Sequence, residues 1–392
     1  QPNPTVGPSA ARQNVDILAP DFELPSVWKA NLALDHELPW WGMIASAELV
    51  LTSVESGIFI QRLDTGAPTV AGQDGRMIYW NAAGRNRANA NPVRGIENGS
   101  GGASNRANRP SDIGDVLLVR NTDKGQSKQL TLSLQRPMED SWAWSFGYTF
   151  TDAQEVSPLT SSINNSNWNN QINFQHSEEV AQNSRYAIRD RLTGTLTYQK
   201  AFFGDNRTTI SMFYEGRSGR PFSYIYFNDI NGDGAATNDL FYVPAGPGDV
   251  IFTGGAAMET AFFEWLAQNP ELAAYSGRVT DANAFRAGWV NNFDLRISQE
   301  IPAFFDGHKA EISLDIMNVG NLITKDWGVI EDYGFFATRR VVNYAGIENG
   351  RYVYTFNPAT VDRPLVQEVR GDDGFNTGVS RWSAMLGFKY KF

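Results

Sequence analysis

The last stretch of the chain, from Arg381 to Phe392, reads RWSAMLGFKYKF and decides the fold. Every second residue, from Trp382 through Leu386 and Phe388 to the end, is apolar or aromatic, whereas the residues between them are mostly small, polar or basic. A period of two puts successive side chains on opposite faces of a β-strand. The stretch therefore predicts a strand with one face against an apolar medium and the other against a polar one.

The same alternation recurs along the chain, at 28–34, 130–134, 142–150, 191–198, 293–297 and 312–316. Strands of soluble sandwiches also alternate, but they need a second apolar surface to cover their apolar faces. Here the alternate positions are hydrophilic and often charged, so the sequence offers no such surface. Lipid outside and water inside satisfies both faces, and a closed ring leaves no unpaired backbone edge in hydrocarbon. The pattern predicts an all-β fold, an antiparallel transmembrane β-barrel of the outer-membrane type.

Composition excludes several other classes of protein. No stretch approaches the ~20 apolar residues of a membrane-spanning helix, and a net charge of −10 argues against a partner made of nucleic acid. The absence of Cys removes disulfides, thiolate nucleophiles and Cys-based zinc sites. The chain begins with Gln and has no signal peptide, so we expect it to be a piece of a longer precursor. The alternative is that the sequence simply starts at this residue, without a purposeful cut.

Short turns and long loops allow the strands to be counted, because outer-membrane barrels have short periplasmic turns and long external loops. Turns are expected at 38–42, 136–140, 200–206, 301–308 and 345–350. They predict about 11 membrane strands, including a weakly alternating one near 337–344, with 116–121 in an external hairpin. A complete single-chain barrel has an even number of strands, so the odd count predicts that this chain is part of a larger barrel. The carboxy terminus is then expected in the periplasm and the region around Gln1 outside the cell.

The predicted external loops are 54–126, 152–185 and 217–288. Apolar residues at helical spacing predict one short helix over 258–274, interrupted at Asn269-Pro270 and packing on the barrel rim. Arginines 85, 87, 94, 106 and 109 could capture an anionic ligand, but we expect a solvated, mobile loop there.

Several phrases, in this order, carry a family resemblance: LPSVWKANLALD (24–35), GRPFSY (219–224), DINGDG (229–234), NDLFYVP (238–244), WVNNFDLR (289–296), LDIMNVGNL (314–322) and the terminal Phe392. The sequence resembles the carboxy-terminal barrel portion of TonB-dependent outer-membrane receptors, most closely the Oar-like branch. The resemblance implies a barrel of about 22 strands closed by a plug, with residues 1–392 as its second half. The plug and first strands would lie outside this chain, in the same precursor or a separate chain. Other expected partners are the TonB complex, lipid and lipopolysaccharide, and Phe392 would be an assembly signal.

The sharpest chemical motif is Asp229-x-Asn231-x-Asp233-Gly234. Oxygen ligands at alternate positions followed by Gly resemble the first half of a calcium-binding loop. The acidic ligand expected at position twelve is replaced by Leu240, and Asp239 lies one position early. The spacing predicts a Ca²⁺ site at Asp229, Asn231, Asp233 and Asp239, with an Asx-rich turn as the alternative.

Charged residues on the polar parity of the strands are predicted to face the lumen and to contact a plug or solute, or one another: Lys29, Asp35, Glu48, Arg191, Asp294, Arg296, Glu311 and Asp315. The histidines, His36, His176 and His308, have no catalytic spacing, so we expect no enzyme and no catalytic residue.

Two functions follow from these expectations. The first is active transport of a scarce or bulky solute across the outer membrane, energised by TonB acting on the plug. The second is a passive pore or a surface structural barrel, which an even count with 116–121 as a twelfth strand would favour.

Overall fold

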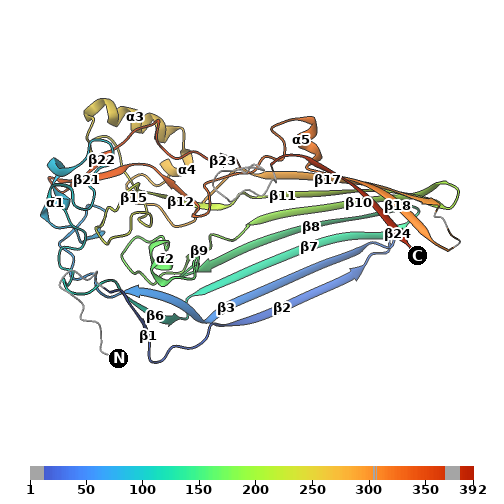
Figure 1. Cartoon of the computed structure of the whole chain (residues 1–392), viewed down its shortest axis with the longest axis horizontal. Coiled ribbons are helices and arrows are strands. Elements are labelled where there is room, and N and C mark those ends of the chain that lie inside the picture. The colour runs from blue at the N-terminus through green and yellow to red at the C-terminus, as the bar shows by residue number, and fades with distance from the viewer. Residues whose placement is uncertain (1–12, 303–304, 306, 367–379) are drawn as a thin grey trace, which may run out of the picture.

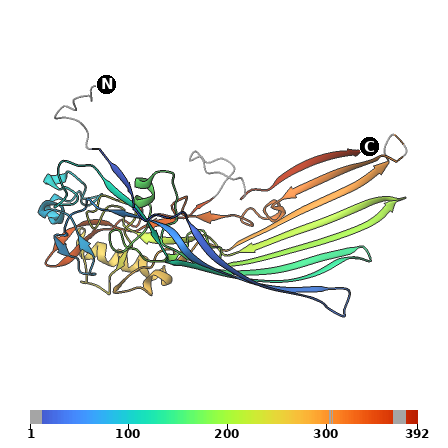
Figure 2. The same ribbon diagram turned by 90° about the horizontal axis from the view of Figure 1, so that it is seen from below.

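The computed structural model describes residues 13–302, 305, 307–366 and 380–392. Its largest feature is a curved antiparallel sheet of nine long strands, each paired with the next along the chain (Figures 1 and 2). They are β2 (Ser26–Glu37), β3 (Ile44–Arg62), β7 (Gly125–Glu139), β8 (Trp142–Glu155), β10 (Asp190–Phe203), β11 (Asn206–Arg217), β17 (Val290–Pro302), β18 (Lys309–Met317) and β24 (Ser383–Lys391).

The two ends of this sheet differ, and we call them the turn end and the loop end. Short connections join β2 to β3, β7 to β8, β10 to β11 and β17 to β18 at the turn end, where the carboxy terminus also lies (Figure 1). The longer connections gather at the loop end together with β1 (Val15–Leu18). Four of the five predicted turns are therefore confirmed, the one at 301–308 by the pairing of β17 with β18, since residues 303, 304 and 306 lie outside the described residues.

The fifth predicted turn, at 345–350, is wrong. It joins β21 (Asn343–Glu348) to β22 (Arg351–Thr355) in a hairpin at the loop end, while β18 pairs directly with β24. Asn349 and Gly350 both have positive φ, the conformation of a tight hairpin turn at either end of a barrel. The predicted strand at 337–344 and the one after 350 are consequently not in the wall, and the described part of the chain contributes nine wall strands instead of about eleven.

Apolar and polar residues alternate poorly over 337–344 because this segment is buried and not part of the wall. Tyr344, Tyr352 and Tyr354 are fully buried and pack in the interior of the loop end, so these strands have no wet face. By contrast, residues 116–121 lie outside the main ladder, as predicted: β6 (Val116–Thr122) pairs with residues 57–62 of β3 and with β1, beyond the part of β3 that pairs with β7. Their external location stays a prediction.

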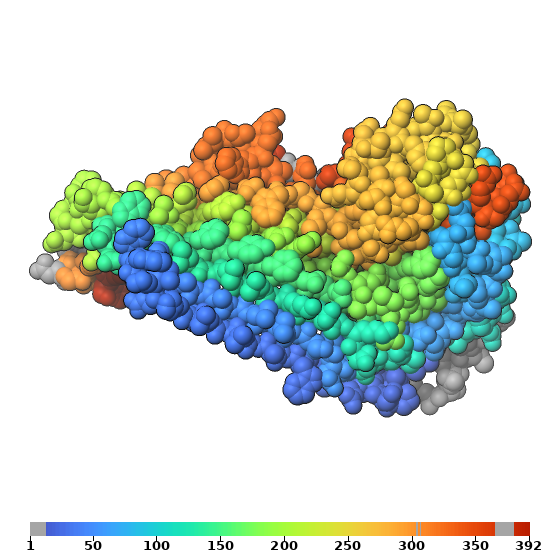
Figure 3. Space-filling model, turned by 180° about the vertical axis from the view of Figure 1, so that it is seen from behind, coloured from blue at the N-terminus to red at the C-terminus, as the bar shows by residue number. Residues whose placement is uncertain are grey.

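Strand register puts the apolar positions on one face of the sheet and the polar positions on the other. Leu386 lies opposite Leu314, and Leu132 lies opposite Tyr148, which in turn lies opposite Leu192. Leu386 is 77% exposed and Phe388 65% exposed, so they are not in a dry protein interior. We assign the apolar face to the convex side of the curved sheet, the side on which a barrel meets lipid; Figure 3 shows the molecule from behind. This is the predicted arrangement of an outer-membrane wall, with lipid outside.

The connections at the loop end fold into a body with its own hydrophobic core, which we call the loop-end body. Its largest buried side chains include Trp80, Tyr226, Phe241, Phe262 and Tyr354. Short strands cross it: β4 (Val70–Ala71), β5 (Met77–Ile78), β9 (Gln182–Asn183), β12 (Pro221–Ile225), β13 (Tyr242–Val243), β14 (Ile251–Phe252), β15 (Arg278–Val279), β16 (Phe285–Arg286), β19 (Glu331–Asp332), β20 (Thr338–Arg340) and β23 (Leu365–Val366).

Helices are short and lie outside the wall: α1 (Ala82–Arg85), α2 (Asn164–Asn169), α3 (Gly255–Ala267), α4 (Pro270–Ala273) and α5 (Val319–Ile323). The helix predicted over 258–274 is present as α3 and α4, with the break at Asn269-Pro270. Phe262, Leu266 and Leu272 pack into the core of the loop-end body. Among the described residues, no helix is long and apolar enough to cross a membrane.

Candidate functional site

The predicted calcium loop, residues 229–239, connects β12 to β13 inside the loop-end body. Asp229, Asn231, Asp233 and Asp239 are all buried there. Nδ2 of Asn231 donates hydrogen bonds to Oδ1 of Asp239 at 2.8 Å and to Oδ2 of Asp233 at 3.2 Å. The fold therefore gathers the side chains that the motif predicted as ligands.

The backbone of this loop turns sharply because two glycines adopt positive φ, 77° at Gly232 and 98° at Gly234. Their N–H groups donate to the two carboxylate oxygens of Asp229, at 2.5 and 2.8 Å. A Cβ atom on Gly232 would lie 2.5 Å from the backbone nitrogen of Trp80, so this position needs glycine for space as well as for conformation.

Two basic side chains from distant segments, an arginine and a histidine, contact the carboxylates of the loop. Nη1 of Arg76 lies 2.9 Å from Oδ1 of Asp239, and Nδ1 of His176 lies 3.2 Å from Oδ2 of Asp233. Burial disfavours the Asp233 carboxylate, but the bond to His176 holds its pKa below the ordinary value. Burial, with the nearby charges of Asp233 and Asp239, raises the pKa of Asp229 well above its ordinary value.

The oxygen-rich chemistry of the loop suits Ca²⁺, but its oxygens are engaged with N–H donors. Within the described part of the chain, no group of three or more His, Asp or Glu side chains is arranged to hold a metal ion. As the side chains lie, the residues do not form a ligand set, and Asx-type hydrogen bonds account for the loop. Calcium binding stays a prediction of the spacing.

A second buried cluster of charges joins the end of β3 to the loop that follows it. Arg62, Arg106 and Arg109 surround Asp64 and Asp115. Nη1 of Arg106 lies 2.7 Å from Oδ2 of Asp64, and Nη2 of Arg109 lies 3.1 Å from Oδ1 of Asp115. Paired in this way, the charges of these arginines can be tolerated away from water.

The expectation of a solvated loop is therefore wrong for Arg106 and Arg109, whose side chains pair with Asp64 and Asp115. Arg94 is exposed as expected, and the mobility of the loop stays a prediction. Besides Arg106 and Arg109, Arg87 pairs with Glu348 at 2.8 Å. The sequence pattern suggests mobility because the segment has few apolar anchors. Its arginines instead pair with acidic residues, of which Asp64 lies 42 positions from Arg106 and Glu348 lies 261 positions from Arg87.

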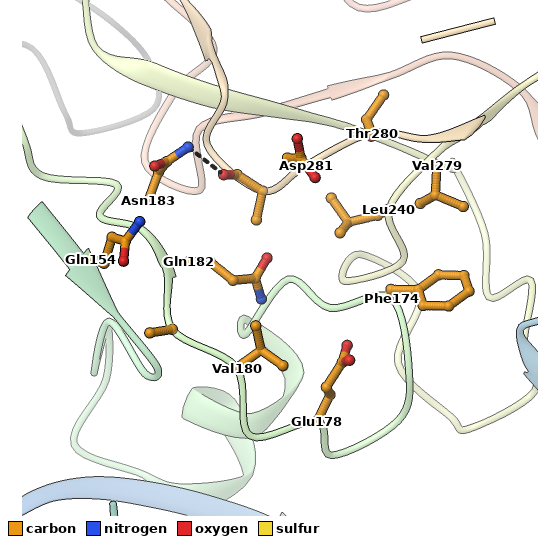
Figure 4. A pocket seen from close by; sticks show the side chains of 12 residues that line it. Gln154, Phe174, Glu178, Val180, Gln182, Asn183, Leu240, Val279, Thr280 and Asp281 are labelled. Carbon is orange, nitrogen blue, oxygen red and sulfur yellow. Dashed lines mark hydrogen bonds between the residues drawn. The ribbon is translucent and has the colours of Figure 1, made fainter. Parts of the chain in front are cut away.

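A cavity of about 470 Å³ lies beside loop 229–239, with Leu240 in its wall (Figure 4). Phe174, Val180, Leu240 and Val279 give it an apolar side. Its polar side chains are amides, a hydroxyl and carboxylates: Gln154, Gln182, Asn183, Thr280, Glu178 and Asp281. Among the described residues that line it, none is basic. The lining therefore suits a neutral or cationic polar solute better than an anion.

The eight charged residues predicted to face the lumen share the concave face by strand register. Several pair with one another or with neighbouring residues, as expected for charges on a wet wall. Nη1 of Arg296 lies 2.9 Å from Oδ1 of Asp315, and Nε of Arg191 lies 2.7 Å from Oε1 of Glu215.

The same wall also carries uncharged polar pairs. Asn31 donates to Glu48 at 2.9 Å, and the hydroxyls of Ser145 and Thr195 lie 2.6 Å apart. The concave face is thus mostly polar, with Val50, Phe213 and Met385 among the exceptions. A mostly polar inner face is the pattern of a water-filled lumen.

Comparison with known proteins agrees with this geometry. The family model described as an outer membrane beta barrel domain matches residues 1–324. The chain belongs to this outer membrane beta barrel family. It is similar to a solved structure, the outer membrane transporter YddB from Escherichia coli, at 10% identity and a TM-score of 0.39, with 88% of this chain and 33% of that chain covered. The chain thus spans about a third of that transporter's length. No curated protein sequence matches it.

In this outer membrane barrel the predicted assembly residue, Phe392, follows β24 at the turn end and is 98% exposed. It makes few contacts that could explain a contribution to stability. An assembly role for Phe392 stays a prediction.

The residues of the barrel that motif reasoning missed are the partners from other segments. Arg76 contacts Asp239, which lies 163 positions later in the chain. His176 contacts Asp233, which lies 57 positions later. No local spacing marks either residue. The one available signal was the surplus of acidic side chains in the loop, which requires a buried cation.

Proposed function

We propose that this chain is part of a TonB-dependent receptor of the Oar-like branch, which transports a scarce or bulky solute across the bacterial outer membrane. The observation that carries this proposal is the pair of open sheet edges. Within the described residues, β2 pairs with β3 alone and β24 with β18 alone. Open edges do not persist in hydrocarbon, so each edge needs a further strand.

The proposed partners follow from that wall. Further strands would continue the sheet from β2 and β24 into a barrel of about 22 strands, whose lumen needs a plug. The charges of the concave wall, such as Arg296 and Asp315, would face the plug or the solute. The convex face would contact lipid and lipopolysaccharide, and TonB would act on the plug. We propose no catalytic activity and no nucleic-acid partner.

The cavity beside loop 229–239 supports a narrower view of the solute. Its lining has carboxylates and amides against an apolar wall, so we propose that solutes received at the loop end are neutral or cationic rather than anionic.

A passive pore remains the alternative function. Its support was the reading of 116–121 as a twelfth membrane strand, which would make the count even. The pairing of β6 with the far end of β3 removes that support.

The test is the composition and conductance of the particle extracted from outer membranes in mild detergent. Native mass spectrometry is expected to find this chain together with a plug-bearing polypeptide, or within a longer chain that carries one. In planar bilayers we expect a closed particle that conducts after mild urea has loosened the plug. A lone 43.5 kDa species with a steady open conductance would favour the pore instead.

A further inference from the structure

A small knob stands out from the convex face of the wall where β18 ends. It comprises residues 318–328 and contains α5 (Figures 1 and 3). β18 ends at Met317, and Asn318 then turns the chain with a φ of 51°. The N–H of Asn318 donates to Oδ1 of Asp294 on β17 at 2.8 Å, which ties the start of the knob to the wall.

Buried amide side chains hold the knob in one shape. Nδ2 of Asn321 donates to the carbonyl oxygens of Lys325 at 2.8 Å and Trp327 at 3.0 Å. Nδ2 of Asn318 donates to the carbonyl of Gly328 at 3.2 Å. These bonds satisfy backbone oxygens of the segment from within and fix its shape.

The knob rests on the lipid-facing side of the sheet. The ring of Trp327 meets the ring of Phe293 edge to face, with centroids 5.6 Å apart. Phe293 shares its face of β17 with Leu295 and Ile297, which register with Met212 and Ile210 of β11 in the apolar face. A Cβ atom on Gly320 would meet the Trp327 ring at 2.7 Å, so the ring lies flat against α5.

The exposed side of the knob carries apolar residues beside a short polar run, Thr324, Lys325 and Asp326. Ile323 is 79% exposed, and Leu322 and Trp327 are exposed beside it. Two further exposed tryptophans flank strands of the wall. Trp289 precedes β17, and Trp382, whose backbone N–H donates to Oδ1 of Asn321 at 3.3 Å, precedes β24. Tryptophans gather at membrane–water interfaces, where an apolar ring and a polar N–H are both accommodated.

We propose that the knob is a membrane-interface anchor, which inserts Leu322 and Ile323 between the headgroups and acyl chains of the outer membrane. The occupant of this surface is lipid because the surface continues the lipid-facing side of the wall without a polar break between Trp327 and Phe293. An interfacial segment of this kind buries apolar side chains to a shallow depth. The inference rests on the barrel fold and not on the transport proposal.

The absence of cysteine makes the test direct, since a single introduced cysteine can be labelled alone. Ile323→Cys carries an environment-sensitive fluorophore in the intact particle, reconstituted in phosphatidylcholine vesicles. Ile163→Cys, exposed in the loop-end body, is the aqueous reference, and Leu386→Cys, exposed on the wall, is the lipid reference. Nitroxide-labelled phosphatidylcholine and aqueous iodide serve as the two quenchers.

We expect the label at 323 to emit at shorter wavelength than the label at 163. It should be quenched several-fold more by the nitroxide lipid and several-fold less by iodide. Quenching by iodide equal to that at 163 would show a solvated knob and overturn the proposal. Shielding from both quenchers would show a protein partner and overturn it equally. If the Ile323→Cys variant does not assemble, Leu322→Cys answers the same question.

Discussion

Asp229 is expected to make the stability of the loop-end body depend on pH. Its carboxyl group is buried with Asp233 and Asp239, and burial and these charges raise its pKa. The folded chain therefore keeps a proton that the unfolded chain releases near pH 4. Stability from this group is present below about pH 4 and is lost as pH rises through the folded pKa.

We expect protection of the Gly232 and Gly234 amides from hydrogen exchange to fall as pH rises above about 4, after correction for intrinsic exchange. Asp229→Asn should flatten this dependence because an amide does not titrate. Asp123→Asn, an exposed acid at the same end, is the matched control and should keep the slope. A slope that survives in the Asp229→Asn variant would contradict the assignment.

The spacing of loop 229–239 also makes a prediction about calcium. Isothermal titration tests the prediction made by the spacing: saturable calcium binding that Asp233→Asn abolishes and Asp123→Asn leaves intact would support it. Binding requires carboxylate oxygens to turn away from their present N–H donors. No heat at saturating calcium would leave the loop as an Asx-rich turn held by its own hydrogen bonds.

Within a single strand, neighbouring positions face different media. In β7, Leu132 is on the convex face and Ser133 on the concave face. Leu132→Arg should destabilise the folded barrel by ~2–4 kcal/mol, because a cation near the bilayer midplane is desolvated. Ser133→Arg should cost much less. Urea titrations of both variants folded into vesicles give the comparison, and equal costs would mean that the convex face is not in lipid.

The last strand ends on Phe392, whose exposure separates assembly from stability. We expect Phe392→Ser to lower the yield of folded barrel in the outer membrane without changing its unfolding in urea. Phe203→Ser removes another exposed ring at the turn end and should leave the yield unchanged. If the two variants assemble equally well, Phe392 is not a signal.

At the scale of the whole molecule, the sheet has distinct ends and its orientation can be tested. A short epitope inserted at Gly246, in an exposed loop of the loop-end body, should bind antibody on intact cells. An epitope at Asp205, in the turn between β10 and β11, should bind only after the outer membrane is opened. The reverse result would mean that the loop end faces the periplasm.

The sequence alone determined the wall, its lipid-facing side and four of its turns. The reason is that the alternation of apolar and polar residues depends on the medium on each side of a strand, and it can be seen over a short stretch. Five residues, 142–146, already show it, with apolar rings at Trp142, Trp144 and Phe146. The helix at 258–274 was equally local, since apolar spacing and a proline mark its extent.

The tertiary structure alone decided what the long loops do. The pairs Arg76–Asp239 and Arg87–Glu348 join segments 163 and 261 residues apart, and no short-range period encodes such contacts. The hairpin at 345–350 has the turn chemistry of a barrel turn, and its place was set by the burial of Tyr344, Tyr352 and Tyr354. Local patterns specify which medium a residue meets, whereas packing between distant segments specifies which neighbours it has.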